Sequence, residues 1–424
     1  MMKGRGLQAI GLRSPVRESR LTKAFAGLLV VRLLYPFFNS PLTHLSSDPL
    51  RHWQTGLDFP HPDVMGGGDP FLYQLWLYGV RSAAGGSDAF VLLTCGVLCA
   101  AMPYGWYRAL REVLSRDRSL LGAIVIGLVP GFLSVYGYFM TETLLLTLTG
   151  FAFWLTLRAD RKRTVGAFAW ACAVWLAASY TRIVVVPMAA LALSWLWICQ
   201  PQKIGKALAA AVLAALITIP AGLHSRAGLG FFSPLGNLYL NEIYHDSGRK
   251  DIHIDFGAKG RYEFGSPSYY NPTFYPLSNW TTSRTGAVDI VVDTHNGRAD
   301  WIREKERIRH GQKSSIHNRW EDFMYLLFGE EWPDSNRDTF IGYLTLWSRW
   351  LWLPLVVGVL LATVGRRYRG RQWLLPASAL GMVTLLALQS EGPMEGRFRK
   401  PIEPVFIAAL VIALARKAPE ASAT

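Results

Sequence analysis

The sequence predicts an all-α polytopic membrane protein, and three observations carry this prediction. Hydrophobic residues make up 51% of the 424 residues and charged residues only 17%, a balance that favours burial in lipid over a soluble fold. Apolar runs of about 17–25 residues recur, each long enough to cross a hydrocarbon core of roughly 30 Å. Many of the sixteen Trp and seventeen Tyr lie near the ends of those runs, as in an interfacial aromatic belt.

The apolar runs predict about ten transmembrane helices. Pro130, Pro187 and Pro220 lie inside three of them, where neighbouring helices satisfy the carbonyls that a proline leaves free. The four cysteines lie in or beside apolar runs, so no disulfide framework is expected. The basic, polar residues Met1–Lys23 do not read as a cleavable signal peptide. The predicted spans are 24–40, 87–107, 119–137, 142–157, 166–180, 183–198, 207–223, 339–364, 372–389 and 401–415.

Lysine and arginine are concentrated in alternate short connections between these spans. This bias is the positive-inside pattern, and it predicts an inner (plasma) membrane protein with both termini in the cytoplasm. The formal net charge of +14 is therefore interpreted as a signal for orientation, and no nucleic-acid partner is expected. The basic connections are 1–23, 108–118, 158–163, 203–206, 366–371 and 416–417.

Two longer connections are predicted on the opposite, external face. In the first, 41–86, the apolar stretch Phe71–Val80 is too short to span and predicts an interfacial helix. The second, 224–338, is rich in aromatic residues and predicts a small mixed α/β cap, with a strand at Val288–Val292 and a helix at Trp301–His310. The chain then divides into an N-terminal transmembrane module (1–223), an external domain (224–338) and C-terminal transmembrane helices (339–424).

Charged residues gather at the external ends of the predicted spans. The segment Ser46–Trp53 holds a carboxylate, a guanidinium, an imidazole and an indole beside the first span. Charges are costly to hold near lipid, so they mark candidate functional sites. The candidate residues are Asp48, Arg51, His52, Asp69, Glu142, Arg182, Glu395, Arg397 and Arg399.

One carboxylate and several arginines suit the transfer of a sugar from a lipid-linked phosphate. The leaving phosphate has a second pKa of about 6 and departs without a general acid, unlike the leaving group of a glycosidase. Its oxygens need cations, which arginine supplies in a planar, bidentate form. The acceptor hydroxyl needs a base. Asp48 is the candidate base, and Arg182, Arg397 and Arg399 are the candidate phosphate ligands.

Structural interpretations of the same residues remain open. Asp48 and Asp69 each precede a proline and can cap helices, and Glu142 can complement a helix dipole. Arg51 and His52 can simply pair with Asp48 or bind lipid headgroups.

Structural roles are equally open for three arginines. Arg397 and Arg399 can bind lipid headgroups, and Arg32, inside the first span, can pair structurally or extend to the interface. No spacing of His, Asp and Glu is specific for a metal: His253 and Asp255 are better explained as a solvated loop. No cofactor is predicted with certainty, and a divalent metal stays possible.

Five short motifs follow one another in order. They are Asp48-Pro49 with Trp53; Asp69-Pro70-Phe71-Leu72 with a glycine-rich exit near Gly85; Pro130 and Tyr136 before Glu142; Thr181-Arg182; and Glu395-Gly396-Arg397-Phe398-Arg399-Lys400-Pro401. This series resembles the GT-C class of integral membrane glycosyltransferases, in particular the branch of the protein O-mannosyltransferases and lipid A aminoarabinose transferases. The likeness covers the first 200 residues and the C-terminal motif.

The resemblance implies an inverting glycosyltransferase. It would take a sugar from a polyprenyl-phosphate donor at the extracytoplasmic face and pass it to a glycan, lipid or protein acceptor, with the N-terminal module as the catalytic part. It implies Asp48 as the loop aspartate, and Arg182 and Arg397 as ligands of the polyprenyl phosphate. Pro49 stands where the family has a second acid, so metal coordination by two adjacent carboxylates is not expected, although Glu142 could substitute.

Two rival functions remain. A ligase or polymerase of lipid-diphosphate-linked glycans would use the same cations. A transporter of lipid or sugar would hold its ionisable groups near the bilayer midplane, whereas these lie at span ends.

Overall fold

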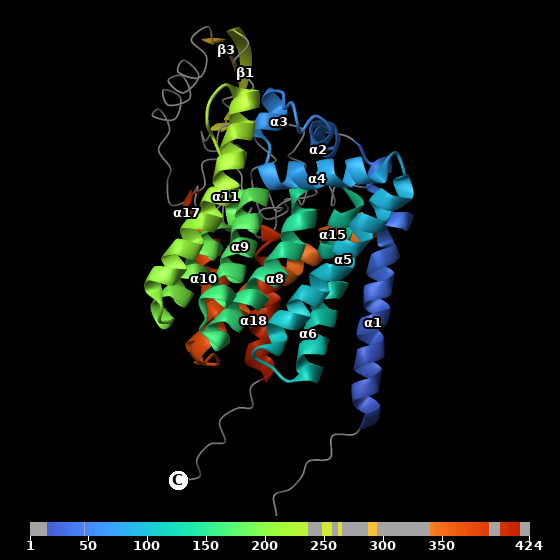
Figure 1. Cartoon of the computed structure of the whole chain (residues 1–424). Helices are drawn as coiled ribbons and strands as arrows, with labels where there is room; N and C mark the ends of the chain where they lie inside the picture. Colours follow the sequence, from blue (N-terminus) through green and yellow to red (C-terminus); the bar gives the residue numbers. More distant parts are fainter. Residues whose placement is uncertain are drawn as a thin grey trace, which may run out of the picture.

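The computed structural model describes residues 15–45, 47–235, 248–256, 262–264, 287–294, 340–389 and 399–415. The described part is a bundle of roughly parallel and antiparallel helices, with three short helices lying across one end (Figure 1). The bundle helices are α1 (Pro15–Phe38), α5 (Asp88–Arg111), α6 (Arg116–Leu128), α7 (Gly131–Ser134), α8 (Thr141–Lys162), α9 (Val165–Thr181), α10 (Val186–Cys199), α11 (Lys203–Leu229), α15 (Phe340–Ser348), α16 (Trp352–Val364), α17 (Leu374–Gln389) and α18 (Glu403–Ala415).

The crossing helices all come from the first predicted loop. They are α2 (Ser47–Leu57), α3 (Val64–Gly68) and α4 (Phe71–Ala84). Helix α4 contains the stretch predicted to be interfacial, and it runs across the ends of the bundle helices instead of along them (Figure 1). Its buried face, Tyr73 and Leu77 among others, packs onto the bundle, so the loop is a folded layer over that end.

Fewer helices meet the length and hydropathy of a membrane span than the ten that were predicted. Three do so among the described residues: Arg20–Thr43, Asp88–Arg111 and Lys203–Leu229. A fourth is possible if α6 and Gly131–Gly137, which meet at a bend of 73°, form one broken span. The ten-span prediction is therefore not confirmed, whereas several helices able to cross a membrane are present.

Helix breaks explain much of the difference. Each predicted span is helical, but Pro130 ends α6 early, and a 3₁₀ turn at Arg349–Leu351 separates α15 from α16. Four other apolar segments, Val165–Thr181, Ile183–Cys199, Trp352–Val364 and Glu403–Ala415, are 10–17 residues long. Hydropathy averaged over a window cannot detect such breaks, because a proline removes a backbone N–H donor without lowering the average much.

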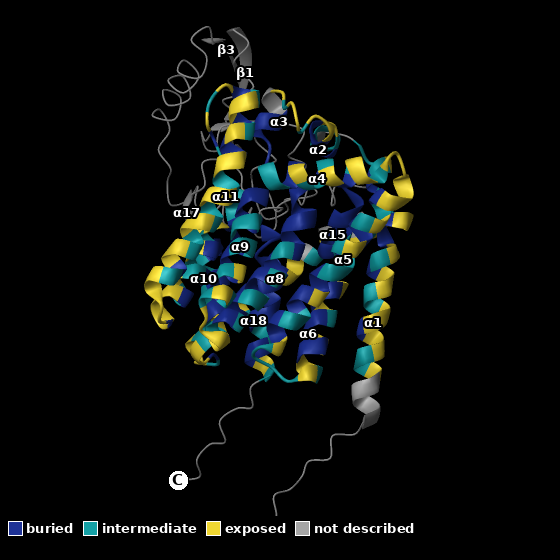
Figure 2. Cartoon of the chain, viewed as in Figure 1, coloured by how far each residue is buried: buried dark blue, intermediate teal, exposed yellow. Residues whose placement is uncertain are grey.

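The outward faces of the long helices are apolar. Val30, Val31 and Leu34 on α1 are exposed, as are Leu208 and Val212 on α11 (Figure 2). The core, by contrast, lies between α5, α8, α9 and the C-terminal helices, around side chains such as Trp106, Phe153 and Trp175. Large apolar side chains facing outward are costly in water and expected against lipid.

The short basic connections meet at the end of the bundle opposite to α2–α4. There Arg161 Nη1 lies 3.0 Å from Glu112 Oε2, and Arg371 Nη2 donates to the Glu112 carbonyl at 2.8 Å. Arg118 donates to the carbonyl of Ala415 at the end of α18. Helix α1 begins and α18 ends at this same end (Figure 1). Basic connections and crossing helices therefore occupy opposite ends, which is the separation that the positive-inside pattern requires.

A short antiparallel sheet is described within residues 224–338. It has the order β2-β1-β3, formed by β1 (Gly248–Phe256), β2 (Tyr262–Phe264) and β3 (Ala287–Thr294). The predicted strand Val288–Val292 lies within β3. The predicted helix Trp301–His310 lies outside the described residues. Three strands alone do not make a mixed α/β cap, so that cap stays a prediction.

Arg32 is buried inside the bundle, with none of its surface exposed. Its Nε donates to the Cys99 carbonyl at 2.7 Å, its Nη1 to the Gly127 carbonyl at 2.8 Å and its Nη2 to the Phe132 carbonyl at 2.7 Å. The first carbonyl would otherwise accept from residue 103, which is a proline without an N–H, and the other two lie at the ends of α6 and α7. Arg32 therefore satisfies carbonyls that Pro103 and the ends of α6 and α7 leave free, and its structural interpretation is confirmed.

Replacing Arg32 by Met is expected to lower the free energy of unfolding by at least about 3 kcal/mol. The apolar side chain leaves three buried carbonyls unpaired, and each costs about 1–3 kcal/mol. Thermal unfolding of the purified full-length protein measures the loss. Arg20→Met, an exposed position on the same helix, is the matched control and is expected to stay within about 0.5 kcal/mol of the wild type. Equal stability of the two variants would contradict the role of Arg32.

Candidate functional site

Helix α2 carries the charged cluster of the first loop. It begins at Ser47, so Asp48 lies in its first turn instead of capping it, and Pro49 follows where its missing N–H costs nothing. Arg51 lies one turn later, and its Nη2 is 3.2 Å from Asp48 Oδ1. The predicted pairing of these two residues is confirmed. The Asp48 side chain keeps 31% of its surface exposed beside this ion pair.

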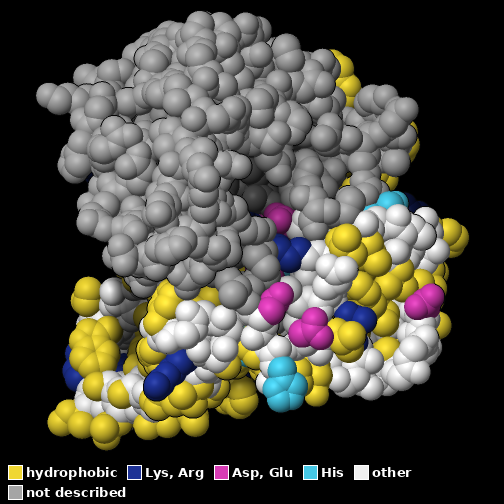
Figure 3. All heavy atoms as spheres, turned by 90° about the horizontal axis from the view of Figure 1, so that it is seen from above, with side chains coloured by type: hydrophobic (Ala, Val, Ile, Leu, Met, Phe, Trp, Pro, Cys, Tyr) yellow, Lys and Arg dark blue, Asp and Glu magenta, His cyan; other side chains and the backbone are white. Residues whose placement is uncertain are grey.

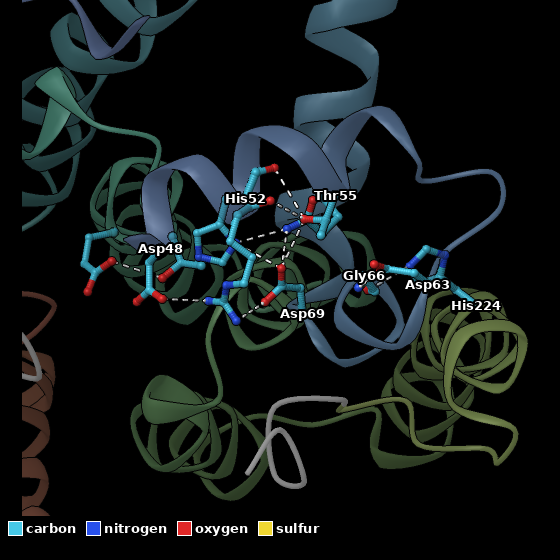
Figure 4. Close-up of polar contacts among 11 residues, drawn as sticks. Asp48, His52, Thr55, Asp63, Gly66, Asp69 and His224 are labelled. Atoms are coloured by element: carbon cyan, nitrogen blue, oxygen red, sulfur yellow. Dashed lines mark hydrogen bonds and ion pairs between the residues drawn. The ribbon is translucent and has the colours of Figure 1, made fainter. Parts of the chain in front are cut away.

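Asp69 lies at the centre of the first loop and is fully buried. Its Oδ1 is 3.1 Å from Arg51 Nη1, and its Oδ2 is 3.2 Å from His52 Nδ1 (Figure 4). The same Oδ2 accepts hydrogen bonds from Thr55 Oγ1 and Gln74 Nε2, both at 3.1 Å. The N-cap of α4 is Pro70, so the alternative that Asp69 caps this helix is wrong. Asp69, just before α4, and Gln74, on α4, lie against α2 and contact its side chains.

Arg51 thus bridges two carboxylates of different character. It contacts the buried Asp69 with one nitrogen and the accessible Asp48 with another. The buried ion pair holds the guanidinium in place, because a carboxylate removed from water must keep its partners. Arg51 and His52 are therefore held by the buried Asp69, and Asp48 is the partly exposed carboxylate of this cluster.

A second charged pair lies where α8 begins and α9 ends. Glu142 is in the first turn of α8, and Arg182 follows the last turn of α9. Arg182 Nη1 pairs with Glu142 Oε1, and Thr141 Oγ1 donates to Glu142 Oε2 at 3.0 Å. Both charged side chains are at most 10% exposed. Glu142 therefore lies where an acid complements the helix dipole, and its carboxylate also binds a guanidinium.

Aromatic contacts join the two charged groups. Trp53 of α2 stacks on Phe139, two residues before α8, with ring centroids 4.4 Å apart, and Arg81 lies over the Trp53 ring at 4.2 Å. Tyr73 packs in the same apolar cluster as Phe139, and its ring meets His52 edge-on at 5.2 Å. Burial raises the pKa of the Tyr73 hydroxyl well above its usual range, so this group stays protonated at neutral pH.

The far side of the first loop is held by α11. His224 Nε2 lies 3.3 Å from the Gly66 carbonyl, and the Gly66 N–H donates to Asp63 Oδ1 at 2.7 Å (Figure 4). Gly67 and Gly228 meet so closely that a Cβ on Gly67 would lie 2.9 Å from the Gly228 Cα. Any larger residue would push α3 away from α11.

Arg399 forms a third charged group at the start of α18. Its Nε donates to Glu403 Oε1 at 2.8 Å, and its guanidinium lies 6.0 Å from the centroid of the Trp352 ring. Arg399 and Glu403 are both almost fully buried. Glu395 and Arg397 lie outside the described residues, so Arg399 is the one candidate residue of the C-terminal motif that the structure describes.

Several residues of the site were missed from the sequence. Thr55 and Gln74 bind Asp69, and Glu403 binds Arg399. The pairing of Glu403 with Arg399 could have been predicted, since the two residues are four apart, the spacing at which side chains meet on a helix. Gln74 could have been noticed less readily, as a polar residue among the apolar residues of α4.

Seen from above, acidic and basic side chains lie close together on this end of the molecule (Figure 3). The carboxylates of the site contact Arg, His and Thr side chains. Within the part of the chain that the structure describes, no group of three His, Cys, Asp or Glu residues is placed to hold a metal ion.

The fold and site together define a class: a helical protein with several helices able to cross a membrane and a charged, folded loop over one end. Comparison with known protein families and with curated proteins found no match for this chain.

Proposed function

We propose that this protein is a membrane glycosyltransferase that moves a sugar from a polyprenyl-phosphate donor to a glycan, lipid or protein acceptor. The observation that supports it most is the accessible carboxylate of Asp48, ion-paired with a guanidinium on a helix that crosses the end of the bundle. The ordered motifs resemble the GT-C class, whose members carry out this chemistry.

In the proposed reaction the acceptor hydroxyl oxygen attacks the anomeric carbon of the donor sugar. Asp48 takes the hydroxyl proton as the new carbon–oxygen bond forms. The bond between the anomeric carbon and the phosphate oxygen breaks, and the electron pair leaves with the polyprenyl phosphate. A single displacement from the opposite face inverts the anomeric configuration. Arg51 holds the Asp48 carboxylate through their ion pair.

Arg182 is the proposed phosphate ligand among the described residues. Glu142 is a positioning residue: it holds the guanidinium at the membrane edge so that its position does not depend on the ligand. A guanidinium has five donors, and a phosphate is a strong bidentate acceptor for them. His52, Asp69 and Arg399 support the binding surface, and Glu395 and Arg397 would complete it.

The finer architecture belongs to the same proposal. About ten spans, with short and broken helices included, would place both termini in the cytoplasm. The site would then lie on the extracytoplasmic face of the inner membrane, with residues 224–338 as a cap near the acceptor. The collection of basic connections at the opposite end of the bundle supports this orientation.

The test is turnover of defined donors by the full-length protein in liposomes. Polyprenyl-phosphate-linked hexoses and pentoses are supplied one at a time with a glycolipid extract, and mass spectrometry follows the released polyprenyl phosphate. We expect time-dependent release from at least one donor and a co-purifying polyprenyl phosphate in native mass spectra. Turnover only with polyprenyl-diphosphate-linked glycans would favour the ligase or polymerase. Movement of the donor across the bilayer without bond cleavage would favour the transporter.

A further inference from the structure

An apolar groove runs along the outer surface of the bundle, at the end away from the charged loop. It has a volume of about 670 Å³ and lies between α6, α16 and α18, with Ser348 and Leu351 at its upper side. Its walls include Leu121 and Val125 of α6 and Leu414 of α18, all of them exposed in the folded chain. A cavity of this size falls within the range of roughly 300–1,000 Å³ that small-molecule sites have.

The length of the groove matches one leaflet of a bilayer. On α6 it extends from Arg118 to Val129, eleven residues apart. At about 1.5 Å per residue this is roughly 16 Å, and half of a hydrocarbon core of roughly 30 Å is about 15 Å. The inner end of the groove coincides with the break between α6 and α7. A chain entering from the basic end would thus reach the middle of the bilayer.

The groove is apolar along its length and basic at its mouth. Arg118 lines that mouth, and its guanidinium donates to the carbonyl of Ala415 at the end of α18, which fixes it there. Arg116, two residues earlier on α6, donates instead to Thr22 Oγ1 of α1 at 3.2 Å and does not line the groove. A phosphodiester matches a guanidinium in charge and geometry, and basic residues near a membrane surface favour anionic lipids.

We propose that this groove binds one anionic phospholipid, with an acyl chain along α6 and α18 and its phosphate at Arg118. The site is distinct from the charged loop, since it opens at the opposite end of the bundle. It requires that the helices be embedded in a bilayer but not that the protein transfer sugars. The lipid would fill the groove between α6, α16 and α18 and so hold the C-terminal helices against α6.

The test is native mass spectrometry of the full-length protein in mild detergent, with equal amounts of phosphatidylglycerol and phosphatidylcholine as probes. We expect one phosphatidylglycerol per chain, retained about fivefold more than phosphatidylcholine, as one basic residue at a membrane surface provides. Arg118→Gln is expected to remove this preference. Arg163→Gln, an exposed arginine outside the groove, is the matched control and is expected to keep it.

A second pair of variants tests the groove itself. Val125→Phe fills it and is expected to lower lipid retention at least about fivefold, whereas Val212→Phe on the outward face of α11 is expected to leave retention unchanged. Leu121→Phe replaces Val125→Phe if that variant does not elute as a single folded species. Equal retention by the groove variant and its control would overturn the proposal. So would equal retention of the two lipids, retention of polyprenyl phosphate in place of phosphatidylglycerol, or a lipid-free dimer.

Discussion

Replacing Asp48 by Asn is expected to lower the rate of sugar transfer by about 10²–10⁴-fold, the usual contribution of a general base. Asparagine has a similar shape but cannot accept the hydroxyl proton. Folding should be nearly unaffected, because the pair of Asp48 and Arg51 is partly exposed and such pairs contribute about 0–1 kcal/mol. The measurement is the initial rate of polyprenyl-phosphate release, with thermal unfolding recorded on the same sample.

Asp58→Asn is the matched control for this variant. Asp58 follows the end of α2 and is exposed, so the same change of charge occurs in the first loop without removing the proposed base. We expect its rate to stay within about twofold of the wild type, as for a surface substitution. A full rate in Asp48→Asn, with normal folding, would refute the proposed mechanism.

Replacing Arg182 by Met is expected to lower the free energy of unfolding by about 3–5 kcal/mol, because it leaves Glu142 as an uncompensated buried charge. Arg163→Met is the matched control at the other end of the bundle. Arg163 is exposed and directly follows α8, so its loss is expected to stay within about 0.5 kcal/mol of the wild type. Thermal or denaturant unfolding distinguishes the two variants.

The double variant Arg182→Met with Glu142→Leu separates stability from function. Removing both charges restores much of the lost stability, since an apolar pair of similar volume is often as stable as a buried ion pair. Donor turnover is expected to remain low, because the proposed phosphate ligand is absent. If the double variant recovers both stability and turnover, the pair is structural and Arg182 does not bind the donor.

The individual residues show how far the sequence could lead. The pairing of Asp48 with Arg51 was predictable, since both lie within one turn of the same helix. The role of Asp69 was not: its position before Pro70 suggested a cap, but its partners are Arg51, His52, Thr55 and Gln74. Those contacts depend on how α2 folds onto α4, which no local pattern specifies.

The spans show the same limit. Apolar run length is a local property, so the helices α1, α5 and α11 were predictable from hydropathy. Where a helix breaks depends also on which partner satisfies the freed carbonyls. Around Pro130 that partner is Arg32, nearly one hundred residues earlier in the chain. The tertiary contact makes the break tolerable, and it shortens the helices below the length of a full span.

The sequence by itself determined that the chain is helical and apolar, that its basic connections alternate, and which charged residues were candidates for the site. These properties follow from composition and from spacing along the chain. Only the tertiary structure decided that Glu142 pairs with Arg182, forty residues later, and that Asp69 is buried while Asp48 stays accessible. Partners and burial depend on which helices pack together, because a charged group near lipid is stable only where the fold supplies its counter-charge.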